Sequence, residues 1–492
     1  MDILTIYAIS VGSIFALLFV LRIKSSLNPW TGLYASFISR HFTYPYLLGR
    51  HRLAGPWTRA GAFFHLVYIA LNAFLTFFHT TSVSDAGHRA GELSMINMIF
   101  LISALHLSYL SDLLGITLRV GRRIHRAAGW AMAALLLFHV SAAIVTRKSS
   151  FSLRRPNDIY TVIGATCFAV LILLSCAFFR HLSYGIFLCS HQALAGVGVY
   201  GIWRHLPPDA RFSWTCLYTA LGILAVTSVL QFLTVLHHNG LFAGRGGPRL
   251  IASCETSSVG KVRLAIPRPL EVYAGQYINL WMPSLSWWSW MRTHPFVVIS
   301  YSPEKQGSLD MLLEPQNAVC EDILRRAQAR KLDTVSLPAL FTGPHGVTEP
   351  VGCYETVLIV ASGFGITAVI PYMKKIIHGY NTSTSQARRL HLVWQAKSLD
   401  IVSAGESLLN DLLQDDILDD GYILSVSIYV THEKLRQHQT PFGEHKRATL
   451  YEGCPSYRDL IAQEASGEQI ERLPNIEDKR GKMLVMGKEL CW

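Results

Sequence analysis

The long apolar runs in the first half of the chain constrain its fold more than any other feature. Up to about residue 240 the sequence consists mostly of apolar stretches of about 18–25 residues, the length that crosses a bilayer core. We predict seven membrane spans, at 4–22, 61–79, 93–111, 125–146, 159–179, 184–206 and 213–237. The first is expected to be a retained anchor, because Asp2 stands where a signal peptide is basic and no small-residue cleavage site follows.

Basic residues between the spans indicate which side of the membrane each loop faces. Two loops are basic and are expected in the cytosol, through Lys24, Arg40, Arg50, Arg52 and Arg59 in the first and Arg119, Arg122 and Arg123 in the second. The loop 80–92 has one arginine against two acids and is expected outside. This orientation puts the N-terminus outside and everything after residue 240 in the cytosol. One loop disagrees with this orientation, because the orientation would place four basic residues outside, namely Arg147, Lys148, Arg154 and Arg155.

Charge and cysteine content argue against two other classes of protein. The formal net charge is +11, but much of it sits in short loops, and no basic stripe with interleaved aromatic residues predicts nucleic-acid binding. The nine cysteines are scattered, odd in number and without a CxxC pair. We therefore expect reduced thiols rather than a disulfide or zinc framework.

Four histidines inside the membrane are candidate haem ligands. His125 and His139 lie on the fourth span, and His191 and His205 lie on the sixth, with 14 residues between the members of each pair. Fourteen helical residues rise about 21 Å and return to within about 40° of the same face. Because both spans run outward, His125 levels with His191 and His139 with His205. Two facing histidines at one depth supply the axial ligands of a haem, so the pattern predicts two stacked haems.

Spacing alone leaves three pairings, because His65 and His79 on the second span are also 14 apart. A lone intramembrane histidine can also simply hydrogen-bond across helices. Side-chain size favours the fourth and sixth spans, where small residues leave room for a porphyrin: Ala127, Ala128, Gly129, Ala131, Ala133, Ala134, Ala193, Ala195, Gly196, Gly198 and Gly201. The second span instead holds large residues: Leu66, Tyr68, Leu71, Phe74, Phe77 and Phe78. We expect His65, His79 and His106 to pack or hydrogen-bond. Three arginines at the inner end either pair with haem propionates or only set topology: Arg122, Arg123 and Arg126.

The second half of the chain reads as two β-containing parts. Residues 249–345 hold short strand-like runs with turn signals, RLIASCE, KVRLAIP, GQYINLWMP, HPFVVIS and SLDMLLEP, which predict a small antiparallel barrel. From 354 a buried strand, the glycine turn SGFGI and a helix follow, and such a turn lets backbone N–H groups approach a pyrophosphate. Alone this turn is weak evidence. The later runs LHLVWQ and YILSVSIYV favour a parallel sheet.

With these features in order, the chain resembles the fungal ferric-chelate reductases, the ferric reductase transmembrane component family, within the superfamily that includes the NADPH oxidases. The resemblance covers about residues 20–485. HPFVVIS and the upstream GQY are similar to the family's flavin motif, which implies these FAD-binding residues: Gly275, Gln276, Tyr277, His294, Pro295, Phe296, Val297, Val298, Ile299 and Ser300. TGPHG, with His345 where an aromatic residue is common, and ASGFGIT resemble its nicotinamide-nucleotide segments, which implies these NAD(P)-binding residues: Gly343, Ala361, Ser362, Gly363, Phe364, Gly365, Ile366 and Thr367.

The resemblance implies both an architecture and an activity. The expected fold is a multi-pass α-helical membrane domain, a bis-haem helix bundle, followed by a ferredoxin-NADP reductase-like module with an antiparallel β-barrel FAD domain and an α/β nucleotide-binding domain. The expected domains are 1–60 (anchor span and cytosolic loop), 61–240 (haem domain), 241–348 (FAD barrel) and 349–492 (NAD(P) domain). Electrons would pass from cytosolic NADPH, or NADH, through FAD and two haems b to an extracellular ferric or cupric chelate. No catalytic side chain is expected.

The implied location is the plasma membrane, with a vacuolar or other endomembrane as the alternative. Membrane lipid and a copper-oxidase/iron-permease uptake system are the implied partners. Two departures weaken the analogy: Gly453-Cys454-Pro455 stands where relatives often have Gly-Arg-Pro, and the ending GKMLVMGKELCW predicts a shortened terminal strand and helix. The alternatives are a superoxide-forming NADPH oxidase, a branch that commonly shortens the second histidine spacing to about 13, and a catalytically inactive haem protein. The sequence leaves the metal, the chelate, the regulation and the oligomeric state open.

Overall fold

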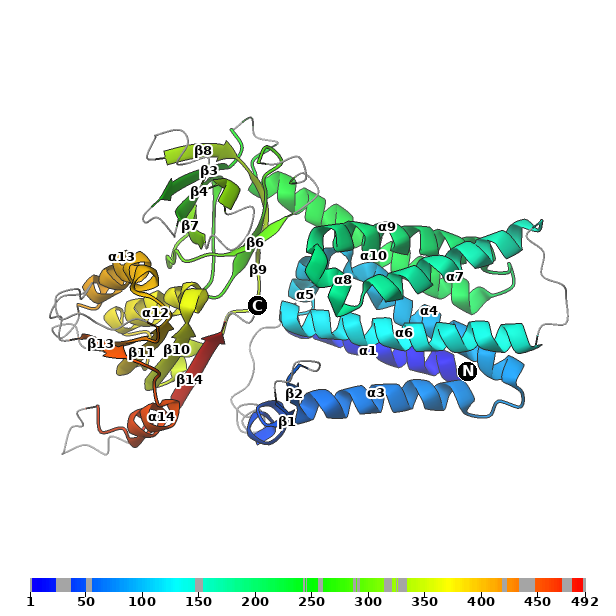
Figure 1. The fold of residues 1–492 in the computed structure, drawn as a ribbon, viewed down its shortest axis with the longest axis horizontal. Helices are drawn as coiled ribbons and strands as arrows, with labels where there is room; N and C mark the ends of the chain where they lie inside the picture. Colours follow the sequence, from blue (N-terminus) through cyan, green and yellow to red (C-terminus); the bar gives the residue numbers. More distant parts are fainter. Residues whose placement is uncertain are drawn as a thin grey trace. The chain divides into compact units, whose positions relative to one another are not determined.

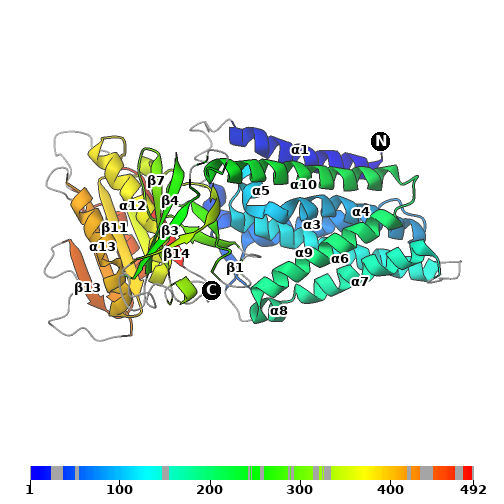
Figure 2. The same cartoon turned by 90° about the horizontal axis from the view of Figure 1, so that it is seen from above.

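The computed structural model describes residues 2–23, 37–49, 55–146, 154–241, 244, 246–254, 260–285, 289, 293–313, 321–323, 325, 334–417, 423–432, 447–470 and 480–489. The chain divides into two compact units, Met1–Gln231 and Phe232–Trp492. The first is helical, and the second carries β-sheets and helices (Figures 1 and 2). The division falls inside the last long helix of the first half.

The helical unit is a bundle of mostly long helices. Its main helices are α1 (Ile3–Ile23), α3 (Arg59–Phe77), α4 (Val83–Ser103), α5 (Leu107–Leu113), α6 (Leu118–Thr146), α7 (Pro156–Leu174), α8 (Ala177–Leu182), α9 (Tyr184–His205) and α10 (Arg211–His238). Two short strands, β1 (Tyr46–Leu48) and β2 (Trp57–Thr58), precede α3, and the turns η1 (Ser39–Thr43) and η2 (Ala104–His106) complete the unit. The carboxyl end of α10 continues into the second unit.

Six helical segments of the described residues are long and apolar enough to cross a membrane: Ile3–Leu21, Arg59–Phe77, Val83–Leu113, Leu118–Thr146, Tyr184–His205 and Arg211–His238. The predicted multi-pass membrane domain is therefore confirmed. The predicted count of seven differs, because Asp158–Leu174 in α7 is only a shorter apolar helix. The spans expected at 93–111 and 125–146 also begin earlier, at Val83 and Leu118. The hydrogen-bonded helices α4 and α6 include polar residues at their N-terminal ends, and a span predicted from apolar residues alone leaves these residues out.

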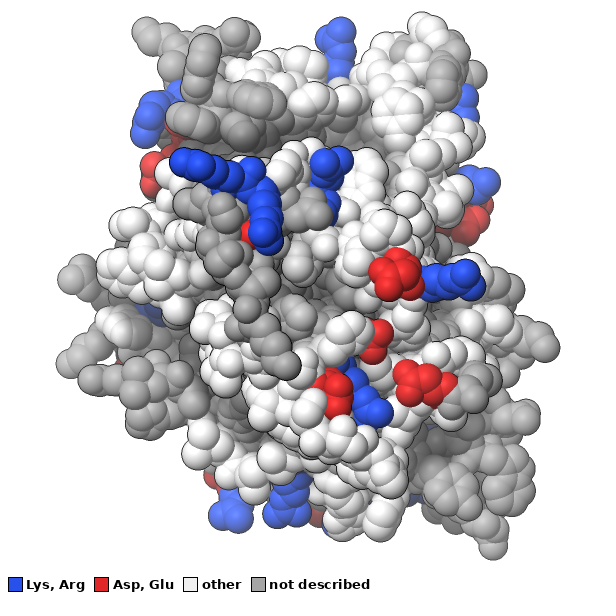
Figure 3. Space-filling model, turned by 90° about the vertical axis from the view of Figure 1, so that its right-hand side faces the viewer, with Lys and Arg blue, Asp and Glu red and all other residues white. Residues whose placement is uncertain are grey.

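The helices of this unit run back and forth between two ends. In Figures 1 and 2 the N-terminus, the α3–α4 connection and the α9–α10 connection lie at one end, and α5 and α8 lie at the other. Such alternation is what the orientation proposed from the loop charges requires. Figure 3 views the first of these ends, where both acidic and basic side chains reach the surface. Of the loop that disagrees with the orientation, residues 147–153 lie outside the described residues.

Close glycine contacts join the helices of the bundle in pairs. A Cβ on Gly87 of α4 would lie 2.6 Å from the Cβ of Ala142 on α6. A Cβ on Gly201 of α9 would lie 2.9 Å from the Cα of Gly164 on α7. Real Cβ atoms do not approach so closely, so these glycines allow α4 to pack on α6 and α7 on α9. The register of both helix pairs is therefore set by residues that lack a side chain.

The predicted antiparallel barrel is confirmed, as two sheets in the second unit. The order β7-β4-β3-β8 forms one sheet and β6-β5-β9 the other, and every pairing is antiparallel. The strands are β3 (Arg249–Cys254), β4 (Gly260–Leu270), β5 (Tyr277–Trp281), β6 (His294–Val297), β7 (Gln306–Leu313), β8 (Thr334–Pro338) and β9 (Leu340–His345). Alternating strand residues such as Leu250, Val262 and Ile278 are fully buried and fill the space enclosed by the sheets.

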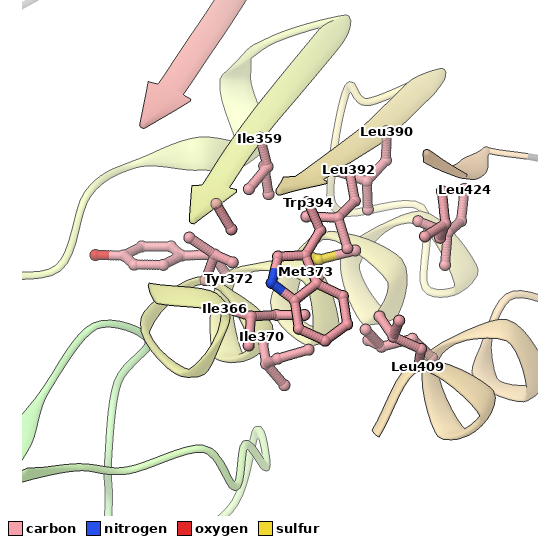
Figure 4. Packing of buried hydrophobic residues seen from close by; sticks show 14 of the residues in the cluster. Ile359, Ile366, Ile370, Tyr372, Met373, Leu390, Leu392, Trp394, Leu409 and Leu424 are labelled. Atoms are coloured by element: carbon pink, nitrogen blue, oxygen red, sulfur yellow. The ribbon is translucent and has the colours of Figure 1, made fainter. Parts of the chain in front are cut away.

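The predicted parallel sheet is also confirmed, with the order β13-β12-β11-β10-β14. Its elements are β10 (Thr356–Ser362), α12 (Ile366–Asn381), β11 (Arg389–Ala396), α13 (Leu399–Asp415), β12 (Leu424–Val430), β13 (Ala448–Glu452), α14 (Tyr457–Ser466) and β14 (Met483–Glu489), with short turns at η4 (Val351–Cys353) and η5 (Gly363–Gly365). Figure 4 shows the core against α12 and α13, where Leu390, Leu392 and Trp394 of β11 meet Met373 and Leu409. One face of β11 is thus entirely apolar.

The terminal segment, for which the sequence predicts a shortened strand and helix, contains a strand of seven residues. Met483–Glu489 forms β14, which runs parallel to β10 from Met483 opposite Thr356 to Glu489 opposite Ser362. β14 is the edge strand of this sheet, next to β10. The two strands β8 and β9 were not foreseen, because Pro338 and Pro344 lie within them and proline interrupts a strand pattern.

Candidate functional site

The inner pair of candidate ligands faces across the gap between α6 and α9. The ring centres of His125 and His191 are 6.2 Å apart, and the ring planes are inclined by 52°. Two metal–nitrogen bonds of about 2 Å, with about 1 Å from each ring nitrogen to its ring centre, also span about 6 Å. The Nδ1 atoms of both rings are buried without a hydrogen-bond partner. This separation fits two rings that bind one metal from opposite sides.

His139, the second candidate ligand on α6, is held by the neighbouring helix α4. Its Nδ1 atom lies 2.8 Å from the carbonyl oxygen of Gly87. A carbonyl can only accept, so Nδ1 is the donor of this bond, and Nε2 is the ring nitrogen that is left to bind a metal. A Cβ on Gly91 would lie 2.9 Å from the same Nδ1, so this glycine makes room for the ring. The ring is thereby prepared to bind a metal through Nε2.

His205, the second candidate ligand on α9, is held from α7. Its Nδ1 atom lies 2.8 Å from Oγ1 of Thr161. The rings of His125 and His191 thus face each other, and the second level, His139 on α6 with His205 on α9, stays a prediction from the 14-residue spacing.

A bis-histidine haem fits the donor set of this part of the chain. No group of three or more His, Cys, Asp or Glu side chains among the described residues could hold a metal ion, whereas a haem needs only two protein ligands. α6 packs closely on α4 and α9 on α7, while α6 and α9 are not a closely packed pair within the described helices. The facing rings therefore border a region without close backbone contact.

The expected role of the small residues on α9 is partly wrong. Gly198 and Gly201 do not face an open space, because their missing Cβ atoms would meet Phe168 at 3.0 Å and Gly164 at 2.9 Å, both on α7. Gly196 has nothing within 4 Å, and Gly129 on α6 has only Leu101, at 4.0 Å. Helix pairing thus uses two of the glycines that were taken as room for the porphyrin.

The two segments that resemble the flavin motif, GQY and HPFVVIS, come together with TGPHG in the sheet β6-β5-β9. Tyr277 of β5 pairs with Val297 of β6 on one side and with His345 of β9 on the other. Gln276 joins two of the segments, since its Nε2 donates to the carbonyl of Gly346 at 3.2 Å. The Oγ atom of Ser300 accepts from the backbone N–H of Asp310 at 3.2 Å. Segments up to 70 residues apart thus form one continuous surface.

The glycine turn of the nucleotide-binding part lies between β10 and α12, as predicted. Gly363 has φ +51°, a left-handed conformation that favours glycine, and a Cβ there would meet nothing within 4 Å. The hydroxyl of Thr367 donates to the carbonyl of Phe364 at 2.8 Å. The turn therefore opens at the carboxyl edge of the parallel sheet, at a helix N-terminus, where backbone N–H groups can face a phosphate.

Two family patterns match the regions that hold these sites. The family described as "Ferric reductase like transmembrane component" matches residues 90–202, which include three of the four candidate haem ligands, His125, His139 and His191, and end just before His205. The family described as "Ferric reductase NAD binding domain" matches residues 354–472, which include the glycine turn. The chain belongs to the ferric reductase transmembrane component family.

Curated relatives agree with this membership at low identity. The ferric/cupric reductase transmembrane component 2 of Saccharomyces cerevisiae is 26% identical over 255 residues, 50% of this chain and 33% of the yeast protein. The ferric reductase transmembrane component 4 of the same yeast is 25% identical over 305 residues, 60% of this chain and 38% of that protein. NADPH oxidase 1 of Rattus norvegicus is 25% identical over 161 residues, 32% of this chain and 27% of the rat protein. The chain thus spans about a third of the length of the relatives it matches.

The three histidines of this ferric reductase-like bundle that were expected to pack or hydrogen-bond have other surroundings than the four candidate ligands. His65 bonds through Nδ1 to the carbonyl of Gly61, 2.7 Å away in its own helix, and its ring meets the edge of Trp57. His79 lies beyond the end of α3 with φ +54° and contacts the ring of Phe78. His106 bonds through Nε2 to Ser228 on α10 at 3.1 Å. None of the three faces a second histidine, which matches the packing and hydrogen-bonding roles expected for them.

The arginines at the inner end have a fourth member that the sequence reading did not include. Arg126 interacts electrostatically with Arg122, Arg123 and Arg180, the last of which lies on α8. The Nε atom of Arg180 is buried without a hydrogen-bond partner. No ion pair joins these four arginines to an acidic side chain among the described residues. The cluster therefore suits an anion such as a haem propionate or a lipid phosphate.

The barrel and the nucleotide-binding sheet of the ferric reductase module meet at Gly275. This residue has φ +85°, and a Cβ there would run into the hydroxyl of Tyr372, which comes from α12. Burial raises the pKa of Tyr372, while its hydroxyl accepts from the backbone N–H of Glu349 at 3.3 Å. Glycine in GQY therefore permits both the turn and the approach of the second domain.

The last turn of α10 is attached to strand β9. The fully buried Asn239 pairs with the backbone of Phe341, donating to its carbonyl at 2.9 Å and accepting from its N–H at 3.0 Å. His238 donates from Nδ1 to the carbonyl of Gly343 at 2.9 Å and stacks on Phe341. The end of the last membrane helix is thus fixed to the strand that carries TGPHG.

Several residues that shape these sites were not predicted from the sequence. Trp394 donates its indole N–H to the carbonyl of Gly363 at 2.9 Å and so holds the glycine turn from the buried side. Gly87 and Thr161 contact the outer histidines from helices that carry no ligand. A tryptophan at the end of an apolar strand is a signal that could have been used. The contacts of Gly87 and Thr161 join different helices, and a single sequence contains no local pattern that predicts them.

Proposed function

We propose that this chain is a transmembrane oxidoreductase that passes electrons from cytosolic NAD(P)H through FAD and two haems to extracellular ferric or cupric chelates. The pair His125 and His191 carries the proposal, because two imidazoles 6.2 Å apart on separate membrane helices suit a single haem iron. The match of the surrounding residues 90–202 to a ferric reductase transmembrane component supports it. The metals are proposed from the yeast relatives, which are named a ferric/cupric reductase and a ferric reductase transmembrane component.

Flavin and haem would supply the conversion of a two-electron hydride donor into single-electron transfer, and the residues of the chain would position them. The four histidines, His125, His139, His191 and His205, would be the axial haem ligands. The flavin would lie against the segments of GQY and HPFVVIS, and Gly343 of TGPHG would contribute to the nucleotide site. The nucleotide would place its pyrophosphate at the turn Gly363–Gly365, where the N-terminus of α12 favours negative charge.

NADPH is the proposed donor by resemblance, and NADH is the alternative. The position after β13 carries Cys454 in place of the arginine of the Gly-Arg-Pro pattern. Its thiol is exposed and accepts from Nε2 of Gln395 at 3.8 Å, while Oε1 of Gln395 accepts from the Tyr457 hydroxyl at 2.7 Å. A thiol and an amide offer no positive charge to a 2′-phosphate, so this corner does not itself favour NADPH.

The proposed location is the plasma membrane, with a vacuolar or other endomembrane as the alternative. Reduction outside the cell would supply the ferrous product to a copper-oxidase/iron-permease uptake system. The match to rat NADPH oxidase 1 supports a second candidate, in which oxygen takes the electron and superoxide forms. The two candidate functions differ in the molecule that accepts the electron, which is a metal chelate in the first and oxygen in the second.

Intact cells that express the protein are expected to reduce a ferric chelate that cannot cross membranes. Reduction would be followed with an impermeant colour reagent for ferrous iron, with and without superoxide dismutase. The colour from ferrous iron is expected to persist when superoxide dismutase is added, because electrons would pass directly to the chelate. Loss of the signal with dismutase would favour the oxidase, and no reduction by a haem-loaded chain would favour an inactive haem protein.

Replacing His294 or Phe296 with alanine is expected to lower the FAD content of the purified protein several-fold. The two residues lie in β6, beside the Tyr277 strand, while the proposed haem ligands lie in the other unit. The haem spectrum should therefore stay unchanged. FAD released by denaturation would be measured by fluorescence, per haem. Full FAD occupancy in both variants would exclude this segment from the flavin site.

A further inference from the structure

The two histidine levels of the helical unit differ in what holds their imidazole rings. At the outer level, Nδ1 of His139 bonds to Gly87 O and Nδ1 of His205 bonds to Thr161 Oγ1, both at 2.8 Å. At the inner level, Nδ1 of His125 and of His191 are buried with no hydrogen-bond partner. Hydrogen bonds from neighbouring helices therefore orient the outer rings, and packing alone orients the inner ones.

The contact of Thr161 with His205 follows from the packing of α7 on α9. Gly164 and Gly201 touch where the two helices cross, with backbone atoms in place of side chains. Thr161 lies about one turn before Gly164, and His205 lies about one turn after Gly201. Because the helices are antiparallel, both steps lead the same way, and the hydroxyl meets the ring. The glycine contact thus sets the register that makes Thr161 a partner of His205.

A ring that donates from Nδ1 keeps the lone pair of Nε2 for a metal. The oxygen of a hydroxyl can accept this hydrogen bond, which fixes the tautomer and the rotation of the ring and makes Nε2 more basic. A more basic axial ligand stabilises ferric over ferrous haem. Valine has nearly the shape of threonine but cannot accept, so the effect of the hydroxyl can be isolated.

We propose that Thr161 is a positioning residue for the outer haem, which orients His205 through its Nδ1 atom and lowers the reduction potential of that haem alone. This rests on the proposed ligation of haem by His205. Among the described residues no hydroxyl bonds to Nδ1 of His125 or His191, so the two haems of one chain should respond differently to the same substitution.

The test is a redox titration of the purified full-length protein, followed by its haem absorbance, in the variants Thr161→Val and Thr161→Ser. In Thr161→Val one of the two haems is expected to titrate at higher potential, and the other should not move. A tenfold change in its ferric-to-ferrous ratio would appear as a shift of about 59 mV. Thr161→Ser keeps the hydroxyl and should titrate like the parent. Thr166→Val is the matched control, an exposed threonine of the same helix.

Each outcome decides a different point. Loss of the outer haem in Thr161→Val with full occupancy in Thr161→Ser would also support the positioning role, because the hydroxyl then rescues binding. Two unshifted haems in Thr161→Val, equal shifts in both haems, or equal effects of valine and serine would overturn it. A parent protein without two haems would instead defeat the proposed function itself.

Discussion

Alanine in place of His139 or His205 is expected to remove the outer haem, and alanine in place of His125 or His191 the inner one. Each haem would have one axial ligand on α6 and one on α9, so losing either ligand leaves a single bond. Electron transfer across the membrane should fall to background in all four variants, because the remaining haem cannot bridge both levels. A pyridine-haem assay and reduced-minus-oxidised spectra would give the haem content, with chelate reduction as the activity.

The chain supplies its own matched controls for this experiment. His65 and His79 have the same spacing of 14 residues, but one ring is bonded to its own helix and the other lies past the helix end. Alanine at either position is expected to leave both haems in place. Haem that is lost in these two variants and kept in the other four would contradict the assignment.

The membrane helices were predictable because the bilayer imposes a simple rule on composition. An apolar run of sufficient length must be helical, since every backbone group has to bond within its own segment. The same rule says nothing of where a helix starts outside the apolar core. Val83 begins α4 well before the predicted 93 because Ser82 caps the helix by accepting from Asp85 N–H at 3.1 Å. Capping decides that end, and hydropathy does not.

The histidine pairs were predictable as a pattern, but their surroundings were not. A spacing of 14 residues fixes which ligands share a face of one helix. It does not say which face of α9 meets α7, and this is why Gly198 and Gly201 were read as room for a porphyrin. Their role depends on Gly164 and Phe168, which lie on another helix. Helical periodicity shows which residues share a face of one helix, but it does not show which other helix packs against that face.

In the nucleotide-binding part, the apolar face of the sheet was evident from the sequence and the polar face was not. A buried strand is predicted by the apolar residues Leu390, Leu392 and Trp394, which are fully buried in the structure. The alternate residues Arg389 and His391 would read as a solvated face, yet His391 is also buried. Their partner is Glu464, some 75 residues later on α14. A buried charge pair of such separation leaves no trace in local patterns.

Glu464 is the centre of this buried network. Its carboxylate accepts from Nε and Nη2 of Arg389 at 3.1 and 2.9 Å, and from Nδ1 of His391 at 2.7 Å. Nε2 of His391 lies 2.9 Å from the hydroxyl of Ser427 on β12. Burial by itself would raise the pKa of Glu464, but the hydrogen bonds from His391 and Arg389 outweigh it and hold the pKa at about 2. The network ties α14 to the middle of the parallel sheet.

Glu464→Gln is expected to destabilise the nucleotide-binding domain by about 3 kcal/mol at neutral pH, since it leaves Arg389 without a counter-charge in a buried site. The pKa shift gives a similar free energy. A carboxyl whose pKa falls from 4.5 to about 2 on folding contributes about 3 kcal/mol to the free energy of unfolding. Because the folded pKa is the lower one, this stability is present above about pH 4.5 and disappears as the pH falls toward 2. Proteolysis of the detergent-solubilised full chain across a urea series would measure it, with the exposed Glu468→Gln as control. Equal midpoints for the two variants, or a difference that does not shrink in acid, would contradict the role assigned to Glu464.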